Sequence, residues 1–258
     1  MSTQDALVPT TELFINTLSF DSGSIASLMG SIIVVEELMR RVQKAQNLPT
    51  LPRPSEHFKF IIGAGFTSLL AIMFGRLRFS IDEAKLHCSK IAKCAFSSRK
   101  WHGGASFKAS KLEAAIKRML ITCGEGEDAR MLDPRASDTD VCRVIVCVAS
   151  EHGTRAGNPV CLRTYPFERN SVPDCTIVEA LRAAFALPEV FKPATILETG
   201  GIGVTYVGLA DYNPTALLLG ELSCVFPDGH VSRIMSVGTS QASDAGMFSP
   251  KQTVVRYR

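Results

Sequence analysis

The amino-acid sequence predicts an α/β fold, with a mainly parallel central sheet sandwiched by helices. Strand-like and helix-like hydrophobic patterns alternate along the chain, which is the order that βαβ units produce. Two strand-like segments also run directly into turns of small residues, at 21–27 and 63–68. Ligand sites in such folds lie at the carboxyl ends of strands, so these two turns are the first candidates for a functional site.

Length and composition agree with one large domain. The chain has 258 residues, of which 46% are hydrophobic and 21% charged, close to the average of globular domains. We expect a loose leader over 1–12 and a single domain over 13–258. The formal net charge of +3 is too small to indicate nucleic-acid binding.

The first elements follow from hydrophobic spacing and from proline. A strand is expected at 13–20, where apolar residues alternate, and a helix at 25–46, where they recur every three or four residues. Three prolines within 47–56 predict a loop. A short buried strand at 58–62 then leads through the second small-residue turn into an apolar helix at 69–74.

The later elements carry similar signals. A Ser-x-x-Glu capping box, Ser80 with Glu83, opens one helix, and Pro214 lies near the first position of another. In chain order we expect helices at 80–93 and 110–120, a surface loop at 121–140, strands at 141–149 and 159–165, a helix at 176–187, a strand at 204–208, a helix at 213–222 and a last strand at 234–237.

The sequence predicts neither a metal nor a cofactor. The eight cysteines form no CxxC pair and have no histidine at ligand spacing, and no glycine-rich phosphate loop is present. Cys142 and Cys147 lie in an apolar run and are expected to be buried small hydrophobes. The five histidines are scattered and indicate no catalytic base.

No targeting signal is recognised in the first residues, which lack a basic and an apolar region. The most apolar stretches, 25–35 and 60–74, are too short or too interrupted to span a bilayer, which needs about 20 residues. We therefore expect a cytoplasmic protein without a transmembrane segment. Peripheral contact with a membrane stays open.

Several segments together resemble one family. FKFIIGAGFTSLLAIMFGRLRFSIDEA (58–84) is similar to the nucleophile-elbow segment of the patatin-like phospholipases, particularly a fungal type. Further likenesses to that family occur in its own order, from about residue 17 to 240. They are LSFDSGSIAS (18–27), NSVPDCTIVEALRAAFALPEVFKP (170–193), TYVGLADYNPTALLLGEL (205–222) and MSVGTS (235–240).

The resemblance implies a lipid acyl hydrolase fold whose nucleophile is missing. The family uses a Ser–Asp dyad, with the serine on a sharp strand-to-helix turn. Gly63 matches the first glycine of that turn, and Gly65 occupies the position of the serine. Phe66, Thr67 and Ser68 replace a small threonine and two glycines. The elbow residues carried over are thus Gly63, Gly65 and Thr67, and none of them can attack an ester at the family's position.

The other catalytic positions also depart from the family. Gly208 stands near the position of the acid, and Asp211 lies close by but outside the motif. The oxyanion loop corresponds to Ser22, Gly23 and Ser24. Two further substitutions follow in that loop, Ala26 for an arginine and Ser27 for a glycine.

Three functional interpretations remain open. The first is a patatin-like protein related to lipid metabolism that lacks or nearly lacks hydrolase activity, a pseudoenzyme that keeps the fold and a lipid or protein surface. The second is an active phospholipase or lysophospholipase with a displaced nucleophile, such as Ser68 or Thr67; the bland alternative is that both residues cap the helix. The third is a marginally folded relic, strained at Phe66. No protein partner is indicated.

Overall fold

The computed structural model describes most of the expected domain. The described residues are 14–97, 99, 105–138, 140–151, 159–167, 174–197, 201–227 and 229–238. The expected leader at 1–12 and the start of the 170–193 segment lie outside this part of the chain.

The centre of the structure is a seven-stranded sheet in the order β5-β6-β3-β2-β1-β7, with β4 paired to β3. The pairs β7–β1, β1–β2 and β2–β3 are parallel, whereas β4, β5 and β6 add antiparallel edges. The prediction of a mainly parallel α/β sheet is confirmed. The strands are β1 (Phe14–Gly23), β2 (Phe60–Gly65), β3 (Arg143–Ser150), β4 (Pro159–Arg163), β5 (Ala194–Leu197), β6 (Gly203–Gly208) and β7 (His230–Val237).

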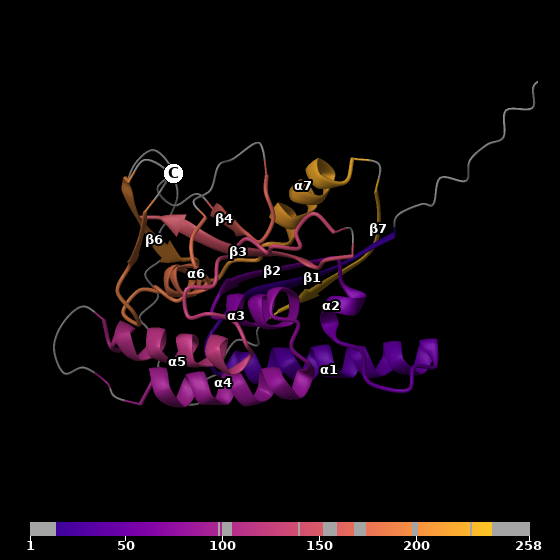
Figure 1. Ribbon diagram of the computed structural model, residues 1–258, viewed down its shortest axis with the longest axis horizontal. Coiled ribbons are helices and arrows are strands. Elements are labelled where there is room, and N and C mark those ends of the chain that lie inside the picture. Colours follow the sequence, from indigo (N-terminus) through magenta and orange to yellow (C-terminus); the bar gives the residue numbers. More distant parts are fainter. Residues whose placement is uncertain are drawn as a thin grey trace, which may run out of the picture.

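Helices cover both faces of this sheet (Figure 1). One face carries most of them, and α7 lies alone on the other side of the sheet among the described helices. The helices are α1 (Ser27–Gln46), α2 (Pro54–His57), α3 (Ser68–Ala71), the π-helix η1 (Ile72–Arg76), α4 (Ile81–Ala95), α5 (Ala109–Thr122), α6 (Ile177–Ala184) and α7 (Thr215–Val225).

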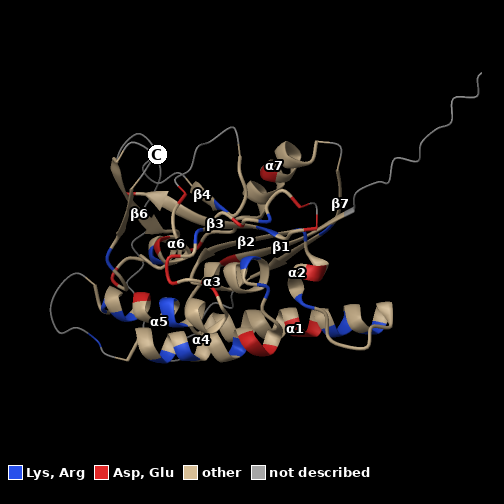
Figure 2. Cartoon of the chain, viewed as in Figure 1, with Lys and Arg blue, Asp and Glu red and all other residues tan. Residues whose placement is uncertain are grey.

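Burial explains why the central strands carry continuous apolar runs. Every residue of β2 is buried, and so is every residue of β3 after the first. Parallel strands covered by helices on both faces have no solvent side and therefore need no polar alternation. Cys142 and Cys147 are buried as expected. Figure 2 shows that charged residues of both signs are mixed along the outer helices α1, α4 and α5.

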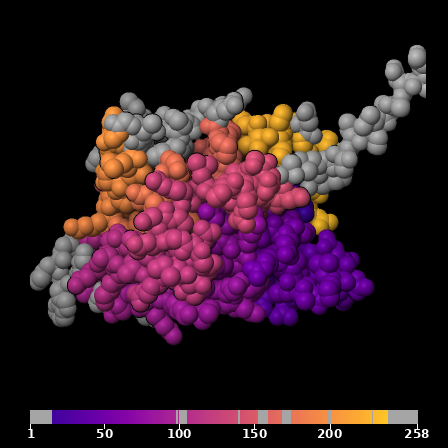
Figure 3. All heavy atoms as spheres, viewed as in Figure 1, coloured from indigo at the N-terminus to yellow at the C-terminus, as the bar shows by residue number. Residues whose placement is uncertain are grey.

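On the face shown in Figure 3, the segments coloured indigo to magenta, from the first half of the chain, adjoin one another without a break. The larger apolar core lies between the sheet and the helices α1, α3, α4, α5 and α6. A smaller core on the other face includes Leu218 and Leu222 of α7. Each face of the sheet is thus closed by its own apolar layer.

Four details differ from the expected elements. Pro54 begins the short helix α2 inside the expected loop 47–56, because proline fits the first helical position. The strand β5 was not expected, since four residues are too few for a periodic signal. The apolar helix after the elbow is part α-helix and part π-helix. β7 begins at His230, earlier than expected, because most of this edge strand is exposed and lacks an apolar pattern.

Candidate functional site

The second small-residue turn joins β2 to α3 at the carboxyl end of the strand. β2 ends at Gly65, and α3 begins three residues later at Ser68. A Cβ on Gly63 would lie 3.0 Å from both the Ser68 nitrogen and the Thr67 carbonyl oxygen. Only glycine lets the start of the helix pack this closely on the strand. The strand therefore turns sharply into the helix.

Gly65 has the backbone conformation that side chains avoid. Its φ of 57° is in the left-handed region. A Cβ on Gly65 would lie 2.5 Å from Oγ of Ser22, a buried residue. The Ser22 hydroxyl donates a hydrogen bond of 2.5 Å to the carbonyl oxygen of Leu209. The hydroxyl of Ser22 thus occupies the space into which a side chain at position 65 would point.

Ser22 also connects three distant parts of the sequence. Its backbone N–H donates to the carbonyl oxygen of Tyr212 at 2.8 Å, so one residue binds both ends of the segment 209–212. The pairing of β1 with β2 is irregular between Phe20 and Gly23, which are aligned with Gly63 and Gly65. The end of β1, the elbow and the segment 209–212 therefore meet at the carboxyl edge of the sheet.

The segment expected as an oxyanion loop is partly strand. β1 continues through Gly23, which is aligned with Gly65, so the first turn begins later than expected. The carbonyl oxygen of Ser24 accepts hydrogen bonds from the N–H and the hydroxyl of Ser27. An oxyanion hole requires N–H groups that point at the developing charge. The N–H of Ser22 is already bonded to Tyr212.

Thr67 holds the elbow against the end of β1. Its side chain is completely buried, and Oγ1 lies 2.7 Å from the carbonyl oxygen of Ala64 and 2.9 Å from that of Asp21. Thr67 occupies the N-cap position of α3, but its side chain makes no capping hydrogen bond. The expectation that Thr67 caps the helix is therefore wrong, because the hydroxyl is turned toward carbonyl groups of the strands.

Ser68 and Phe66 are both buried. The hydroxyl of Ser68 has no hydrogen-bond partner among the residues that the structure describes, and the expected cap is not formed there. Phe66 packs on Phe96 and Phe185, with ring centroids 5.9 and 4.7 Å away. Its φ is not positive, so the left-handed conformation lies at Gly65 and the strain expected at Phe66 is not found.

Neither expected acid position supplies a carboxylate to the elbow. A Cβ on Gly208 would overlap the carbonyl oxygen of Ala184, and the Gly208 N–H donates to Ala186 at 3.1 Å. Asp211 is exposed, with a φ of 48°. Within the described residues its carboxylate has no hydrogen bond or ion pair. Gly208 is thus fixed by packing against α6, and Asp211 projects into solvent.

A polar network that the sequence did not predict lies beside the elbow. Oγ of Ser236 donates to the Asp21 carboxylate at 3.2 Å, and Nδ2 of Asn213 donates to Ser236 at 3.4 Å. Oγ1 of Thr215 lies 3.0 Å from Oγ of Ser19. The network links β1, β7 and the start of α7. Burial raises the pKa of Asp21 above its ordinary value, while the hydrogen bonds from Ser236 and Asn213 oppose that rise.

The Asp21 network could have been inferred only in part. The segments that carry Asp21, Asn213 and Ser236 each appeared in the family resemblance, but the hydroxyls had no separate signal. Their positions at the ends of β1 and β7 depend on the pairing of these two strands, which are far apart in the sequence.

The similarity to known proteins is confined to structure. No family model matches the chain, and no curated protein matches its sequence. Among solved structures, the chain is similar to VipD from Legionella pneumophila, with 9% sequence identity and a TM-score of 0.44. The match covers 78% of this chain and 46% of VipD, so this chain spans about half the length of that protein. At this distance the similarity transfers no activity to the chain.

Proposed function

We propose that this chain is a patatin-like domain that does not hydrolyse acyl esters at its elbow. The observation that supports this most directly is the Ser22 hydroxyl, which lies 2.5 Å from the position of a Cβ on Gly65. Acyl transfer requires a nucleophile, an adjacent base and donors for the oxyanion. Gly65 has no side chain, and Gly208 has no room for one.

The alternative of a displaced nucleophile finds little support at the two hydroxyls nearest the turn. Both Thr67 and Ser68 are fully buried. The hydroxyl of Thr67 lies against carbonyl groups of β1 and β2. Ser68 is the first residue of α3 and is buried there. An attacking oxygen has to reach the substrate carbonyl, and a displacement of about 1 Å can reduce the rate about 100-fold. These positions favour a structural role for both residues.

A lipid surface is the binding partner that we propose for the domain. Three apolar side chains at the start of α1 are exposed: Met29 by 41%, Ile33 by 60% and Val34 by 45%. In the sequence, these three residues follow soon after the segment 22–24, which was expected to form the oxyanion loop. Clustered exposed apolar side chains are a feature of membrane and ligand contacts. No described helix combines the length and hydropathy of a bilayer-spanning segment.

Hydrolysis is tested with a short-chain ester and a lysophospholipid. The wild type, Gly65→Ser and the double variant Ser22→Gly/Gly65→Ser are compared with buffer and with one another. We expect the wild type to remain at the buffer rate. Turnover well above buffer by the wild type would contradict the proposal, and its loss in Ser68→Ala would identify the displaced nucleophile.

Lipid contact is tested separately by flotation with phosphatidylcholine vesicles. We expect the wild type to float and Ile33→Glu to remain in the soluble fraction. The matched control is Ile121→Glu, at an equally exposed isoleucine of α5 (59%). Equal flotation of both variants and the wild type would show that the start of α1 is not the contact surface.

A further inference from the structure

A polar pocket lies at the amino edge of the parallel strands, opposite the elbow. Lys59 and Cys142 line it, and each directly precedes the first residue of a central strand. The other walls come from α2, from the chain after η1 and from the loop before β3. The cavity has a volume of about 470 Å³ and is lined by Arg53, Ser55, Glu56, Lys59, Arg78, Arg135, Asp138, Asp140, Val141 and Cys142. Small-molecule sites have volumes of about 300–1,000 Å³.

Three of the four cationic side chains in this pocket already have an anionic partner. Lys59 pairs with Asp140 at 2.8 Å, and Arg53 pairs with Glu83 at 3.0 Å. Arg135 binds both carboxylate oxygens of Asp133, at 3.0 and 3.2 Å.

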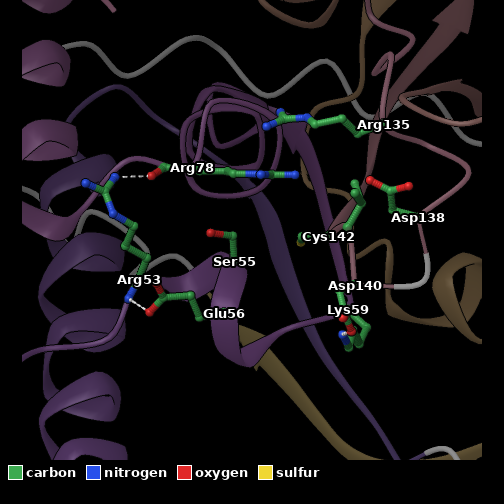
Figure 4. A pocket seen from close by; sticks show the side chains of 10 residues that line it. Arg53, Ser55, Glu56, Lys59, Arg78, Arg135, Asp138, Asp140 and Cys142 are labelled. Atoms are coloured by element: carbon green, nitrogen blue, oxygen red, sulfur yellow. Dashed lines mark hydrogen bonds and ion pairs between the residues drawn. The ribbon is translucent and has the colours of Figure 1, made fainter. Parts of the chain in front are cut away.

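The fourth cation, Arg78, differs from these three. Among the described residues, the Arg78 guanidinium has no hydrogen bond or ion pair. Figure 4 shows its side chain extended across the pocket, from the side of Arg53 toward the side of Arg135. Arg78 as a whole residue is half-buried, and its guanidinium lines the pocket without a partner among the described residues. An anion in the pocket would supply that partner.

The backbone of Arg78 is strained, and nothing in the local backbone requires an arginine at this position. Its φ of 55° is left-handed, and it follows the end of η1, where glycine is the usual residue. A non-glycine residue there costs about 1–2 kcal/mol. Strain of this kind often accompanies binding sites. The observation fits a side chain that is kept for its contact in the pocket.

We propose that this pocket binds a small phosphate monoester with neighbouring hydroxyl groups, and that Arg78 binds the phosphate. A guanidinium can donate two parallel hydrogen bonds to phosphate oxygens. Ser55 of α2 also lines the pocket, and its hydroxyl can donate a further hydrogen bond. The carboxylates of Glu56, Asp138 and Asp140 disfavour a polyanion and can accept hydrogen bonds from hydroxyl groups. A volume of about 470 Å³ leaves space for a carbon skeleton beside the phosphate.

Glycerol 3-phosphate and lysophosphatidic acid both carry a phosphate monoester beside a free hydroxyl group, the first in solution and the second in a lipid headgroup. Calorimetric titration of the full chain with glycerol 3-phosphate tests the first source. Flotation with phosphatidylcholine vesicles, with and without lysophosphatidic acid, tests the second. Binding that depends on Arg78 in either arm supports the proposal and identifies the source. An absence of such binding in both arms overturns it.

Arg78→Gly separates binding from folding. Glycine relieves the left-handed strain, so we expect the melting temperature to stay equal or rise, while affinity falls about tenfold to hundredfold with the loss of a charged hydrogen bond. The matched control Arg41→Gln removes an exposed guanidinium of α1 outside the pocket and should bind as the wild type does. Equal binding of glycerate and glycerol 3-phosphate would overturn the phosphate assignment. Unchanged affinity in Arg78→Gly would overturn the role of Arg78.

Discussion

The two edges of the parallel sheet are built in opposite ways. At the carboxyl edge, the Ser22 hydroxyl fills the space beside Gly65, and α6 fills the space beside Gly208. At the amino edge, a cavity of about 470 Å³ remains between charged side chains. The carboxyl edge is where α/β folds usually bind ligands. In this chain the expected catalytic positions are packed. Arg78, whose guanidinium has no partner in the described part of the chain, lies at the other edge.

This contrast teaches that a fold alone does not determine which edge can bind a ligand. The backbone turn at Gly65 is present, with its left-handed φ of 57°. Chemistry depends on the side chains that surround such a turn. The following experiments test how firmly the carboxyl edge is closed, beginning with the largest expected effect.

Introducing an acid at Gly208 should be the most disruptive change. The Cβ of Gly208→Asp would overlap the carbonyl oxygen of Ala184. The new carboxylate would also be buried without a hydrogen-bond donor or a cation placed to receive it among the described residues. We expect a loss of about 3 kcal/mol or more in the free energy of unfolding, measured by urea denaturation. Ala210→Asp, at an exposed position two residues later, is the control and should change stability little. A Gly208→Asp variant as stable as that control would show that α6 can move aside.

Introducing a serine at Gly65 should have the next largest effect. Gly65→Ser combines a left-handed φ with a contact of 2.5 Å to the Ser22 hydroxyl, so we expect a loss of about 1–3 kcal/mol. A double-mutant cycle with Ser22→Gly measures the coupling. The double variant should be more stable than the sum of the single changes predicts. Additive effects would mean that the two side chains do not compete for one space.

Removing the Thr67 hydroxyl should have a smaller effect. Thr67→Val keeps the shape of the side chain but leaves the carbonyl groups of Ala64 and Asp21 without this donor, which costs about 1–2 kcal/mol in the buried site. The control is Thr122→Val in α5, where an exposed threonine bonds to the Arg118 carbonyl at 2.7 Å. Equal losses in the two variants would show that burial of the Thr67 bond adds nothing.

The smallest expected effect concerns Asp21. Burial raises its folded-state pKa above the ordinary 3.8, so its contribution to stability is present below pH 3.8 and is lost as the pH rises through the folded-state pKa. Asp21→Asn has no such titration. We expect the melting temperature of the variant, relative to the wild type, to increase from pH 3.5 to pH 7 by about 2 °C or less. A difference independent of pH would contradict the raised pKa.

Much of the fold could be predicted because its signals are local. The buried runs of β2 and β3 and the capping box at Ser80 depend on neighbouring residues alone. The small helix α2 and the strand β5 could not be predicted in this way, because each has only four residues. The antiparallel edge strands also left no pattern that distinguishes them from parallel ones.

The candidate site was predictable as a set of segments but not as a set of contacts. Glycines at 63, 65 and 208 stood out in the sequence. The reason for Gly63 is local, at Thr67 and Ser68, whereas the reasons for Gly65 and Gly208 are partners farther along the chain. Gly65 faces Ser22, and Gly208 faces Ala184. The pocket around Arg78 had no sequence signal, because its walls come together only when the loop before β3 packs near α2.

The contact between Ser22 and position 65 also orders the mutational steps by which a serine could enter the elbow. A serine at 65 that arises first meets an occupied space. A glycine at 22 that arises first loses the 2.5 Å hydrogen bond from the hydroxyl to Leu209 and opens the space. The second order passes through the milder intermediate. A library that varies position 65 alone would therefore miss the sequences in which a serine is tolerated there, and one that varies both positions together would sample them.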